Sequence, residues 1–452
     1  MRARPIRRIR QIFGAFQTFA QNEASGGILL LISAVSAMIW VNSAQGAGYA
    51  DFWHTKFGLS LGADEFKLTL HHWINDALMA LFFLVVGLEI KREVLVGELA
   101  DLRAAALPIA AAIGGMLVPA TIFAALNAGT PTSGGWGIPV ATDIAFALGI
   151  LALVGSRVSI SIKVFLTALA IVDDIGAVLI IALFYSKSID LQALLGAGVT
   201  YAIMLGLNAM GVRKTTAYLV LGAFLWVFVF RSGIHATIAG ILTALAIPAR
   251  SKIDGGTFLT ATRDTLDEFE ALTDQPSGRP LSPDHETLVH HVSVNVAQIA
   301  APLQTLMHSL HPYIAYLVVP IFALANSGIL LSASEMQQAV ASPLFWGVSL
   351  GLVLGKMAGV TLGSWLAVRS GLARLPEGVT WPQIFGVSWL AGVGFTMSIF
   401  VTELAFSGPK EIEIAKLGIL VASLVAGIGG YLILRRAFAT PVPVSPASAT
   451  AS

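Results

Sequence analysis

Two adjacent aspartates, Asp173 and Asp174, stand in the middle of an otherwise apolar run that reads LAIVDDIGAVLIIALFY (169–185). Carboxylate oxygens are hard ligands that suit small hard cations, and they also take up protons. Successive residues on a helix point about 100° apart, so one aspartate can face a cavity while the other faces a neighbouring helix. Because the same oxygens would hold either protons or a cation, the pair predicts a site at which the two displace each other.

Asp143 and Lys356 are further ionisable residues inside long apolar stretches, and Thr142 places a hydroxyl beside the first of them. A charged residue at the centre of a membrane-spanning helix costs about 2.5–3.5 kcal/mol, so the Asp173–Asp174 pair alone costs about 5–7 kcal/mol. A structural salt bridge between helices is the alternative interpretation, but buried ion pairs are weak stabilisers at best. The cost therefore favours a functional site built from these residues.

The composition indicates the solvent in which these residues lie. The chain has 452 residues, of which 56% are hydrophobic and 12% charged, whereas soluble domains have about 25% charged residues. This imbalance predicts an integral membrane protein. A net charge of +1 gives no sign of a nucleic-acid partner, and the lack of cysteine excludes disulfides and thiol chemistry. The sequence has no nucleotide-binding GxxxxGK(S/T) motif and no metal-ligand cluster, so we expect no cofactor and no enzyme activity.

Apolar stretches long enough to span a bilayer, roughly 17 to 25 residues, recur along the chain, and we expect an all-α protein with twelve transmembrane helices. The predicted spans are 24–43, 70–92, 103–127, 134–155, 159–186, 190–211, 215–231, 233–249, 311–331, 343–369, 381–406 and 411–435. They form two groups, within 24–249 and 311–437, joined by a long polar loop at 250–310 that we place in the cytoplasm. A basic flank (1–23) precedes them, and a Pro/Ala/Ser-rich tail (438–452) has too little apolar surface to order itself.

The distribution of Lys and Arg predicts the orientation of these spans. Short cytoplasmic loops are enriched in Lys and Arg. With the N-terminus inside, the inner connections collect most of the 27 Lys and Arg residues. An odd number of spans would destroy this bias, so we expect both the N- and the C-terminus in the cytoplasm.

Two of the predicted spans carry helix-breaking residues at their centres. GIPVATDIAFALG (137–149) contains Pro139, and LAGVGFTMSIF (390–400) contains Gly392 and Gly394 just before Thr396. Paired interruptions in corresponding halves of a chain point to a transport site built from discontinuous helices. The triplets 103–186 and 343–435 each have the interrupted span in the middle, and their first spans are an odd number of spans apart. We therefore expect inverted three-helix repeats with two discontinuous crossing helices.

Six long motifs follow one another in order along the chain. They are INDALMALFFLVVGLEIKRE (74–93), PVATDIAFALG (139–149), LTALAIVDDIGAVLIIALFY (166–185), SGIHATIAG (232–240), LGKMAG (354–359) and GVGFTMSIF (392–400). In these motifs the chain resembles the NhaA family of bacterial sodium/proton antiporters, from about Ala24 to Arg436. The resemblance implies a multi-pass inner-membrane protein that extrudes sodium or lithium in exchange for protons, electrogenically and with activation at alkaline pH. This family is itself an example of inverted repeats with an ion site at the midplane.

The resemblance also implies roles for the matching residues of the ion site. Asp174 matches the principal sodium ligand, and Asp173 matches a proton carrier or gate that pairs with the intramembrane Lys356. Thr142 and Asp143 match the Thr-Asp of the first broken helix. The sodium ion and the protons are thus the expected partners of these side chains, with the bilayer around them.

Other positions match regions of the family that lie away from the ion. The residues that match its cytoplasmic funnel and pH response are Asp76, Glu89, Lys91 and Arg92. A charged cap at a helix end is an equal alternative for the last three, and His235 is either a helix-packing or a proton-sensing histidine. The stretch 51–69 matches a periplasmic β-hairpin used in dimer contact, so a homodimer is expected.

Two features depart from the family pattern. Thr305-Leu306-Met307-His308 stands where the family has Arg-Leu-Glu-His, so the acidic residue associated with its pH sensor is replaced by Met307. The 250–310 loop is long for the family and rich in acidic residues. It is either a solvated loop or a segment with a regulatory or cation-gathering role.

Two other classes of function remain open on the sequence. A proton-coupled carrier of another cation or of a small solute would have the same buried carboxylates, and competition by sodium distinguishes the two. A gated cation channel would pass ions without a proton gradient, and mutually exclusive binding at the carboxylate pair argues against it.

Overall fold

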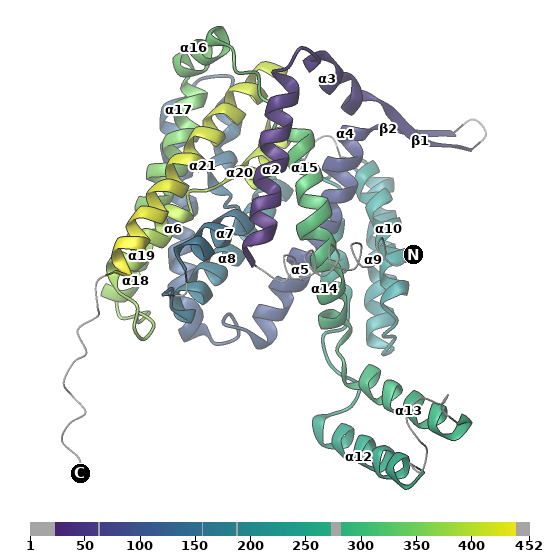
Figure 1. Ribbon diagram of the computed structural model, residues 1–452. Coiled ribbons are helices and arrows are strands. Elements are labelled where there is room, and N and C mark those ends of the chain that lie inside the picture. The colour runs from purple at the N-terminus through teal and green to yellow at the C-terminus, as the bar shows by residue number, and fades with distance from the viewer. Residues whose placement is uncertain (1–22, 62–63, 156, 187–188, 273–281, 440–452) are drawn as a thin grey trace, which may run out of the picture.

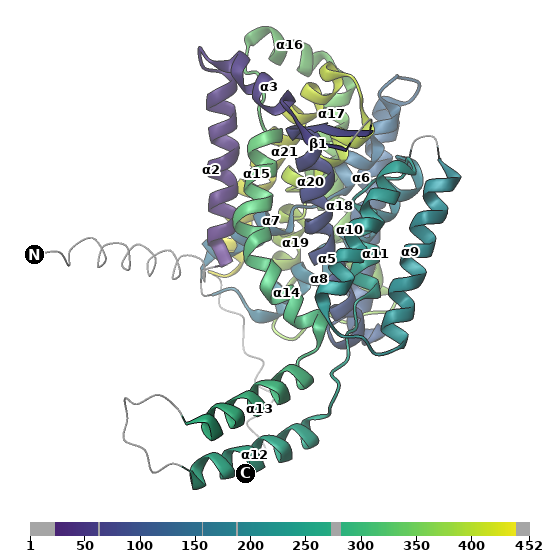
Figure 2. The same ribbon diagram turned by 90° about the vertical axis from the view of Figure 1, so that its right-hand side faces the viewer.

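The computed structural model describes residues 23–61, 64–155, 157–186, 189–272 and 282–439. Residues 1–22 of the predicted basic flank and 440–452 of the predicted tail lie outside them. The described chain is mostly helical and forms one bundle, from which a β-hairpin and a pair of helices project at opposite ends (Figures 1 and 2). We call the end with the hairpin the hairpin face and the end with the helix pair the loop face.

The helices follow one another with short connections. In the first half they are α2 (Glu23–Val41), α3 (Gly46–His54), α4 (Leu70–His72), η1 (Trp73–Leu78), α5 (Met79–Val96), α6 (Leu102–Asn127), η2 (Ser133–Val140), α7 (Ile144–Val154), α8 (Ile160–Phe184), α9 (Leu191–Ala209), α10 (Thr215–Arg231) and α11 (Ile238–Ala246). In the second half they are α12 (Gly255–Ala271), α13 (Pro283–Ile299), α14 (Pro302–Tyr313), η3 (Ile314–Val318), α15 (Val319–Asn326), α16 (Ala333–Ala341), α17 (Pro343–Leu350), η4 (Gly351–Gly355), α18 (Lys356–Arg369), α19 (Trp381–Leu390), α20 (Phe395–Ala405) and α21 (Pro409–Ala437).

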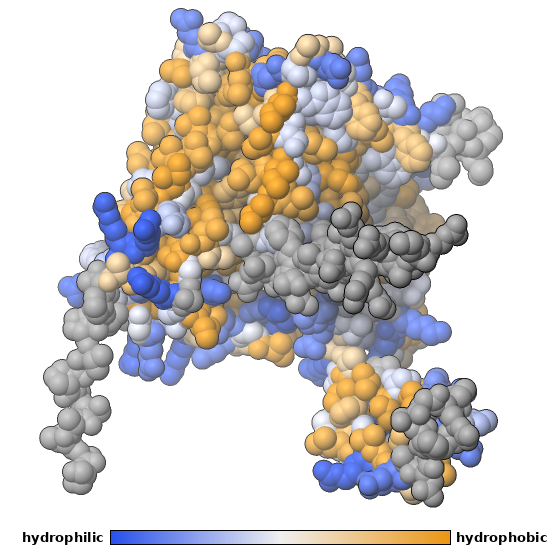
Figure 3. Space-filling model, viewed as in Figure 1, coloured by the Kyte–Doolittle hydropathy of each residue, from blue (hydrophilic) through white to orange (hydrophobic). Residues whose placement is uncertain are grey.

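On the face shown in Figure 3, hydrophobic residues form a broad band across the bundle, and hydrophilic residues gather toward its two ends. Within the described residues, eight helices are long and apolar enough to cross a membrane, or up to ten if each of two bent pairs is one span. The bent pairs are α2 with α3 (114°) and α19 with α20 (45°). The helices α10 and α11, with 17 and 9 residues, do not reach the length that this test requires.

The segment 250–310, which we expected as a loop, contains two helices. The helices α12 and α13 pack against each other and project from the loop face (Figure 1). Each begins with a side-chain cap, because Asp254 accepts a hydrogen bond from the N–H of Thr257 and Ser282 accepts one from the N–H of His285. The next helix, α14, begins at Pro302, before the predicted start of the ninth span at 311.

The stretch 51–69 contains the hairpin that its alternating apolar residues indicate. Strands β1 (Lys56–Leu61) and β2 (Asp64–Thr69) pair antiparallel, with Lys56 opposite Thr69 and Leu61 opposite Asp64. The hairpin joins α3 to α4 and extends sideways from the bundle (Figure 1). It therefore presents an edge at the hairpin face.

Helices α6 and α18 approach each other closely because glycines line their contact. A Cβ atom at Gly359 would lie 2.2 Å from the carbonyl oxygen of Gly114, and one at Gly363 would lie 2.3 Å from that of Ala110. Small residues four apart allow such contact between helix backbones in membranes. Lys356 belongs to the same helix, and its aliphatic chain passes beside Gly115. The glycine contact therefore fixes where the lysine enters the bundle.

Replacing Gly359 by alanine is expected to destabilise the protein by about 1–3 kcal/mol, because the new methyl group has no room against α6. The measurement is the thermal melting temperature of the purified protein in detergent. Gly206→Ala, at a position in α9 with nothing within 4 Å of the added Cβ, is the matched control and should melt like the wild type. Equal melting temperatures for the two variants would contradict the close contact.

Candidate ion-binding site

The carboxylate of Asp143 caps the N-termini of two different helices. Asp143 is the N-cap of α7, where its Oδ1 accepts a hydrogen bond from the N–H of Phe146 at 3.0 Å. Its Oδ2 accepts from the N–H of Thr396 at 3.0 Å, in the first turn of α20, and from the Thr396 hydroxyl. A helix N-terminus carries partial positive charge. One buried carboxylate therefore faces two positive helix ends at once.

The backbone is extended or turned on the other side of each helix end. The N–H of Asp143 donates to the carbonyl of Val393 at 2.7 Å, so the connection between η2 and α7 lies against the connection between α19 and α20. The Ser398 hydroxyl donates to the carbonyl of Ile138 at 2.9 Å. Pro139 lies within the 3₁₀ helix η2, and Gly392 and Gly394 lie between α19 and α20. Hydroxyls and one carboxylate thus pair polar backbone groups that the two interrupted helices leave exposed.

Lys356 forms a buried ion pair with Asp173. Its side chain has no solvent exposure, and its Nζ donates to Oδ2 of Asp173. The π-helical turn η4 comes directly before Lys356, and such turns are frequent at functional sites. The Thr142 hydroxyl lies 2.5 Å from the same Oδ2 and 2.8 Å from the carbonyl oxygen of Ala391, and its one hydrogen can be donated to either. The ammonium of Lys356 and the two interrupted helices therefore meet at one oxygen of Asp173.

Asp174 lies next to this pair with unused ligand capacity. It is 2% exposed, and its Oδ1 has no hydrogen-bond partner within the described part of the chain. The Oδ1 of Asp173 is likewise buried without a partner there. A buried polar atom without a partner is costly, and in native proteins such an atom is commonly explained by a bound ion or a functional role. Two such oxygens on neighbouring residues can bind a cation or a proton.

The oxygen atoms around Asp173 and Asp174 are ligands of the kind that suit a small hard cation. Among the residues that the structure describes, no group of three or more His, Cys, Asp or Glu side chains is arranged to hold a metal ion. Carboxylates, hydroxyls and carbonyls are instead available around Asp173 and Asp174, and oxygen ligands of this kind bind alkali and alkaline-earth cations. Such a mixed set binds through few charges, which allows release.

The predicted funnel residues lie on η1 and α5, where Asp76 is far from Glu89, Lys91 and Arg92. Lys91 donates to the carbonyls of Leu245 and Ile247, at the C-terminal end of α11, at 2.6 and 2.5 Å. Glu89 and Arg92 are close to it near the loop-face end of α5. Asp76 is in η1, which runs directly into α5. It precedes Glu89 by thirteen residues, which is about 20 Å along the helix axis. The structure therefore does not bring Asp76 together with the other three.

His235 is half-buried and its Nε2 lies 3.0 Å from the carbonyl oxygen of Tyr185, at the end of α8. Met307 is buried in the core that α14 forms with α5 and α11. The hydrogen bonds of Asp173 and Lys356 described above involve neither His235 nor Met307. His235 instead contacts the end of α8, and Met307 packs between α14 and its neighbouring helices.

Sequence reasoning missed two buried ionic contacts. Glu93 is 8% exposed and pairs with the neighbouring Arg92. Glu403 of α20 pairs with Lys416 of α21 at 2.6 Å, and His71 lies 4.0 Å from the same carboxylate. The usable signal was an acid and a base that both fall within predicted spans.

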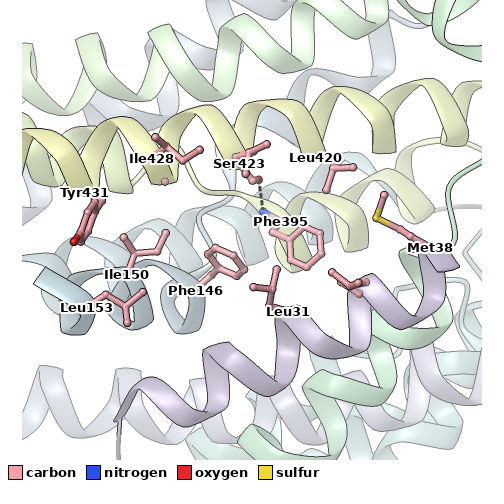
Figure 4. A pocket seen from close by; sticks show the side chains of 14 residues that line it. Leu31, Met38, Phe146, Ile150, Leu153, Phe395, Leu420, Ser423, Ile428 and Tyr431 are labelled. Carbon is pink, nitrogen blue, oxygen red and sulfur yellow. Dashed lines mark hydrogen bonds between the residues drawn. The ribbon is translucent and has the colours of Figure 1, made fainter. Parts of the chain in front are cut away.

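The groove shown in Figure 4 is separate from the ion site. It has a volume of about 450 Å³ and lies between α2, α7 and α21, with mainly apolar side chains such as Leu31, Phe146 and Ile428. At its floor the N–H of Phe395 donates to the Ser423 hydroxyl at 3.2 Å. This bond anchors the first residue of α20 to α21. A groove lined in this way offers an ion no charged ligand.

Comparison with known proteins gives a consistent result over nearly the whole chain. The profile of a family described as Na+/H+ antiporter 1 matches residues 17–434. The chain is 51% identical over 427 residues to the Na(+)/H(+) antiporter NhaA of Oleidesulfovibrio alaskensis, covering 94% of this chain and 95% of that protein. It is 45% identical over 447 residues to the protein of the same name from Koribacter versatilis, covering 98% and 97%. It is 44% identical over 430 residues to the one from Sulfurimonas denitrificans, covering 95% and 97%.

Replacing Lys356 by alanine is expected to destabilise the protein by about 3–5 kcal/mol, because it leaves the carboxylate of Asp173 buried without its counter-charge. Thermal melting of the purified variant measures the loss. Adding Asp173→Asn to Lys356→Ala should recover part of it, since the double variant has no uncompensated charge. Lys410→Ala, at an exposed lysine, is the control. A single variant that melts like this control would argue against the ion pair.

Proposed function

Because the chain belongs to the NhaA family of Na+/H+ antiporters, we propose that it is a secondary active carrier that extrudes sodium from the cytoplasm in exchange for protons. Lithium, a smaller hard cation, is proposed as a second substrate of the same oxygen ligands. The observation that carries the proposal is the Asp173–Asp174 pair, buried where two interrupted helices meet and with an unpartnered oxygen on each residue.

We propose an architecture of twelve spans. The eight long apolar helices and the two bent pairs account for ten, and α10 and α11 supply the remaining two. In this arrangement α6, η2–α7 and α8 form one three-helix repeat, and α17–α18, α19–α20 and α21 form its inverted counterpart. The η2–α7 and α19–α20 spans are the discontinuous helices that cross. The contact between Asp143 and Thr396 supports this assignment, and the family is an established example of the fold.

In the proposed cycle, the ammonium of Lys356 pairs with the carboxylate of Asp173 when no cation is bound. A sodium ion arriving from the cytoplasm binds to the deprotonated Asp174, its principal ligand, and Asp173 exchanges Lys356 for the ion. Asp143 and the Thr142 and Thr396 hydroxyls hold the interrupted helices around it. A rearrangement of one helix group against the other then exposes the ion to the opposite face, where protons displace it. Exchange is obligatory because both substrates use the same oxygens.

The two-carboxylate site also supports electrogenic exchange. If Asp174 loses one proton and the Asp173–Lys356 pair loses a second, from the Lys356 ammonium, when one monovalent cation binds, each cycle carries net charge across the membrane. We further propose activation at alkaline pH through the charged side chains near the loop-face end of α5, namely Glu89, Lys91, Arg92 and Glu93. The contact of Lys91 with the end of α11 links that group to a neighbouring helix. Because Met307 replaces an acidic residue of the family, the pH of activation is expected to differ from that of its relatives.

We place the protein in the bacterial inner membrane with both termini in the cytoplasm. The loop face carries Arg103, Arg157, Arg250, Arg369 and Arg435 near helix ends, as the positive-inside rule requires of a cytoplasmic side. The hairpin face is then periplasmic. The α12–α13 segment is cytoplasmic in this orientation.

Replacing Asp174 by asparagine is expected to abolish sodium-driven proton movement, because the amide keeps the size of the side chain but cannot ionise. The assay is sodium-induced dequenching of a pH-sensitive dye in everted membrane vesicles, scanned from acidic to alkaline pH. Asp267→Asn, at an exposed aspartate of α12, is the control and should behave as wild type. Retained exchange in Asp174→Asn would refute the site. A wild-type response to another cation or solute, with none to sodium at any pH, would favour the alternative carrier.

We also propose that the β1–β2 hairpin joins two copies of the chain into a homodimer. Replacing residues 57–68 by a short Gly/Ser linker is expected to convert dimers into monomers in detergent, because the exposed strand edge is lost. Light scattering coupled to size-exclusion chromatography measures the mass. The linker variant should keep the melting temperature of the monomer bundle, and a dimer that persists would place the interface elsewhere.

A further inference from the structure

Glu403, Lys416 and His71 form a second buried ionic cluster, closer to the hairpin face than the ion site. The carboxylate of Glu403 lies 2.6 Å from Nζ of Lys416 through one oxygen and 4.0 Å from Nε2 of His71 through the other. The side chains of Glu403 and Lys416 are 12% and 9% exposed, and that of His71 is 25% exposed. Ionisable residues at such depth in a membrane protein are costly, and they commonly mark ion or proton pathways.

The neighbours of His71 fix which nitrogen is able to take up a proton. Its Nε2 lies 3.0 Å from Oδ1 of Asn326, which only accepts. The amide of Asn326 is held in this orientation because its Nδ2 donates to the carbonyl of Phe322 and to Oδ1 of Asn75. The Nε2 of His71 therefore carries a hydrogen in the neutral ring. The Nδ1 has only a long 3.4 Å contact with the Asn75 amide, so Nδ1 is the basic nitrogen.

A cavity connects the cluster to the hairpin face. It has a volume of about 530 Å³ and is lined by side chains that include His71, Lys416, Glu413, His54 and Tyr49. Its walls come from α3, from the chain just after α15 and from the first turns of α21, all of which lie at that end of the bundle (Figure 2). Water in this cavity can therefore reach His71 from the hairpin face.

Glu403 also lies in line with the ion site along α20. It follows Thr396, the partner of Asp143, by seven residues, which places both on one side of the helix about 10 Å apart. Phe400 lies between them on the same side and is fully buried. Its ring packs against those of Phe83 and Phe322, with centroids 5.4 and 6.2 Å away. These three rings, which we call the aromatic barrier, pack together midway along α20 between Thr396 and Glu403.

We propose that His71, held between Glu403 and Asn326, is a proton-binding site at the hairpin-face entrance of the transport pathway. This inference rests on the proposed antiport. A proton from water in the cavity binds to Nδ1, and the imidazolium is stabilised by the carboxylate of Glu403. When the aromatic barrier opens, the imidazolium returns to its neutral form and the proton passes through water to the carboxylates of the ion site. Lys416 keeps Glu403 ionised while His71 is neutral.

The charge balance around His71 sets the expected signs. Within the described residues, the titratable and charged side chains that face it are Glu403 and His72, together with Lys416, Glu413, His54 and Tyr49 around the cavity. Glu403 is the closest negative charge and Lys416 carries the opposing positive charge. Removing the first disfavours the imidazolium, and removing the second favours it. Histidine titrates in the range of roughly pH 5–8, where such changes are measurable.

The test measures sodium flux while the pH is varied at one face at a time. Everted and right-side-out vesicles expose opposite faces to the buffer, and the luminal pH is held constant. His71→Gln is expected to lose the histidine step in the hairpin-face pH profile, while its loop-face profile superimposes on that of the wild type. His54→Gln, which lines the same cavity outside the ionic cluster, is the control and should keep both profiles. Identical profiles for His71→Gln and wild type, or equal changes at both faces, would overturn the proposal.

Two charge variants decide the question even if His71→Gln does not fold. Glu403→Gln should move the half-maximal pH at the hairpin face to more acidic values, and Lys416→Met should move it to more alkaline values. A cluster with a purely structural role would change the flux without these opposite shifts, and that result would refute the site. Failure of the antiport itself is distinguishable, because the wild type would then show no sodium flux in either type of vesicle.

Discussion

The structure depends on how the backbone groups at the breaks of two interrupted helices, η2–α7 and α19–α20, are paired inside an apolar bundle. In lipid, a backbone N–H or carbonyl without a partner costs several kcal/mol. Here the carboxylate of Asp143 accepts hydrogen bonds from the first turns of both α7 and α20, and the hydroxyls of Thr142 and Ser398 each reach a carbonyl of the other interrupted helix. One of these groups, the Thr142 hydroxyl, also lies 2.5 Å from Oδ2 of Asp173, so the groups that satisfy the backbone adjoin the aspartate pair.

The glycines of α18 and the charge of Lys356 serve that arrangement. A lysine can be buried only where its ammonium meets an acceptor, and the close contact of α18 with α6 directs it to Asp173. The pair is sensitive to its partners, because the loss of either charge leaves the other buried alone. A cation that competes for Asp173 therefore competes with Lys356 as well. In the proposed cycle this competition ties occupancy of the candidate ion site to the position of α18.

Much of the candidate site could be predicted from the sequence, since charges in apolar runs are conspicuous. Asp143, Asp173, Asp174 and Lys356 stood out by their cost alone, and Gly392 and Gly394 mark the connection between α19 and α20. The ends of spans were harder to interpret. The pairing of Glu403 with Lys416 had a weaker signal, because both stand near the ends of spans and hydropathy does not show where a helix end is covered by others. The segment 250–310 was expected as a loop because its helices are polar. The π-helical turn before Lys356 has no signal in the residue pattern.

The aromatic barrier lies at the level of α20 between Thr396, the partner of Asp143, and Glu403. Phe83, Phe322 and Phe400 come from three helices, α5, α15 and α20, so their packing changes if α20 moves against the other two. Asp143 accepts a hydrogen bond from the N-terminal turn of α20. Glu403, near the C-terminal end of α20, pairs with Lys416 of α21. A change of charge at either end thus acts on the same eleven-residue helix. In the proposed cycle, binding at the candidate ion site and opening toward the hairpin face are coupled through this helix, because it contacts Asp143 at one end and carries Phe400 between that end and Glu403.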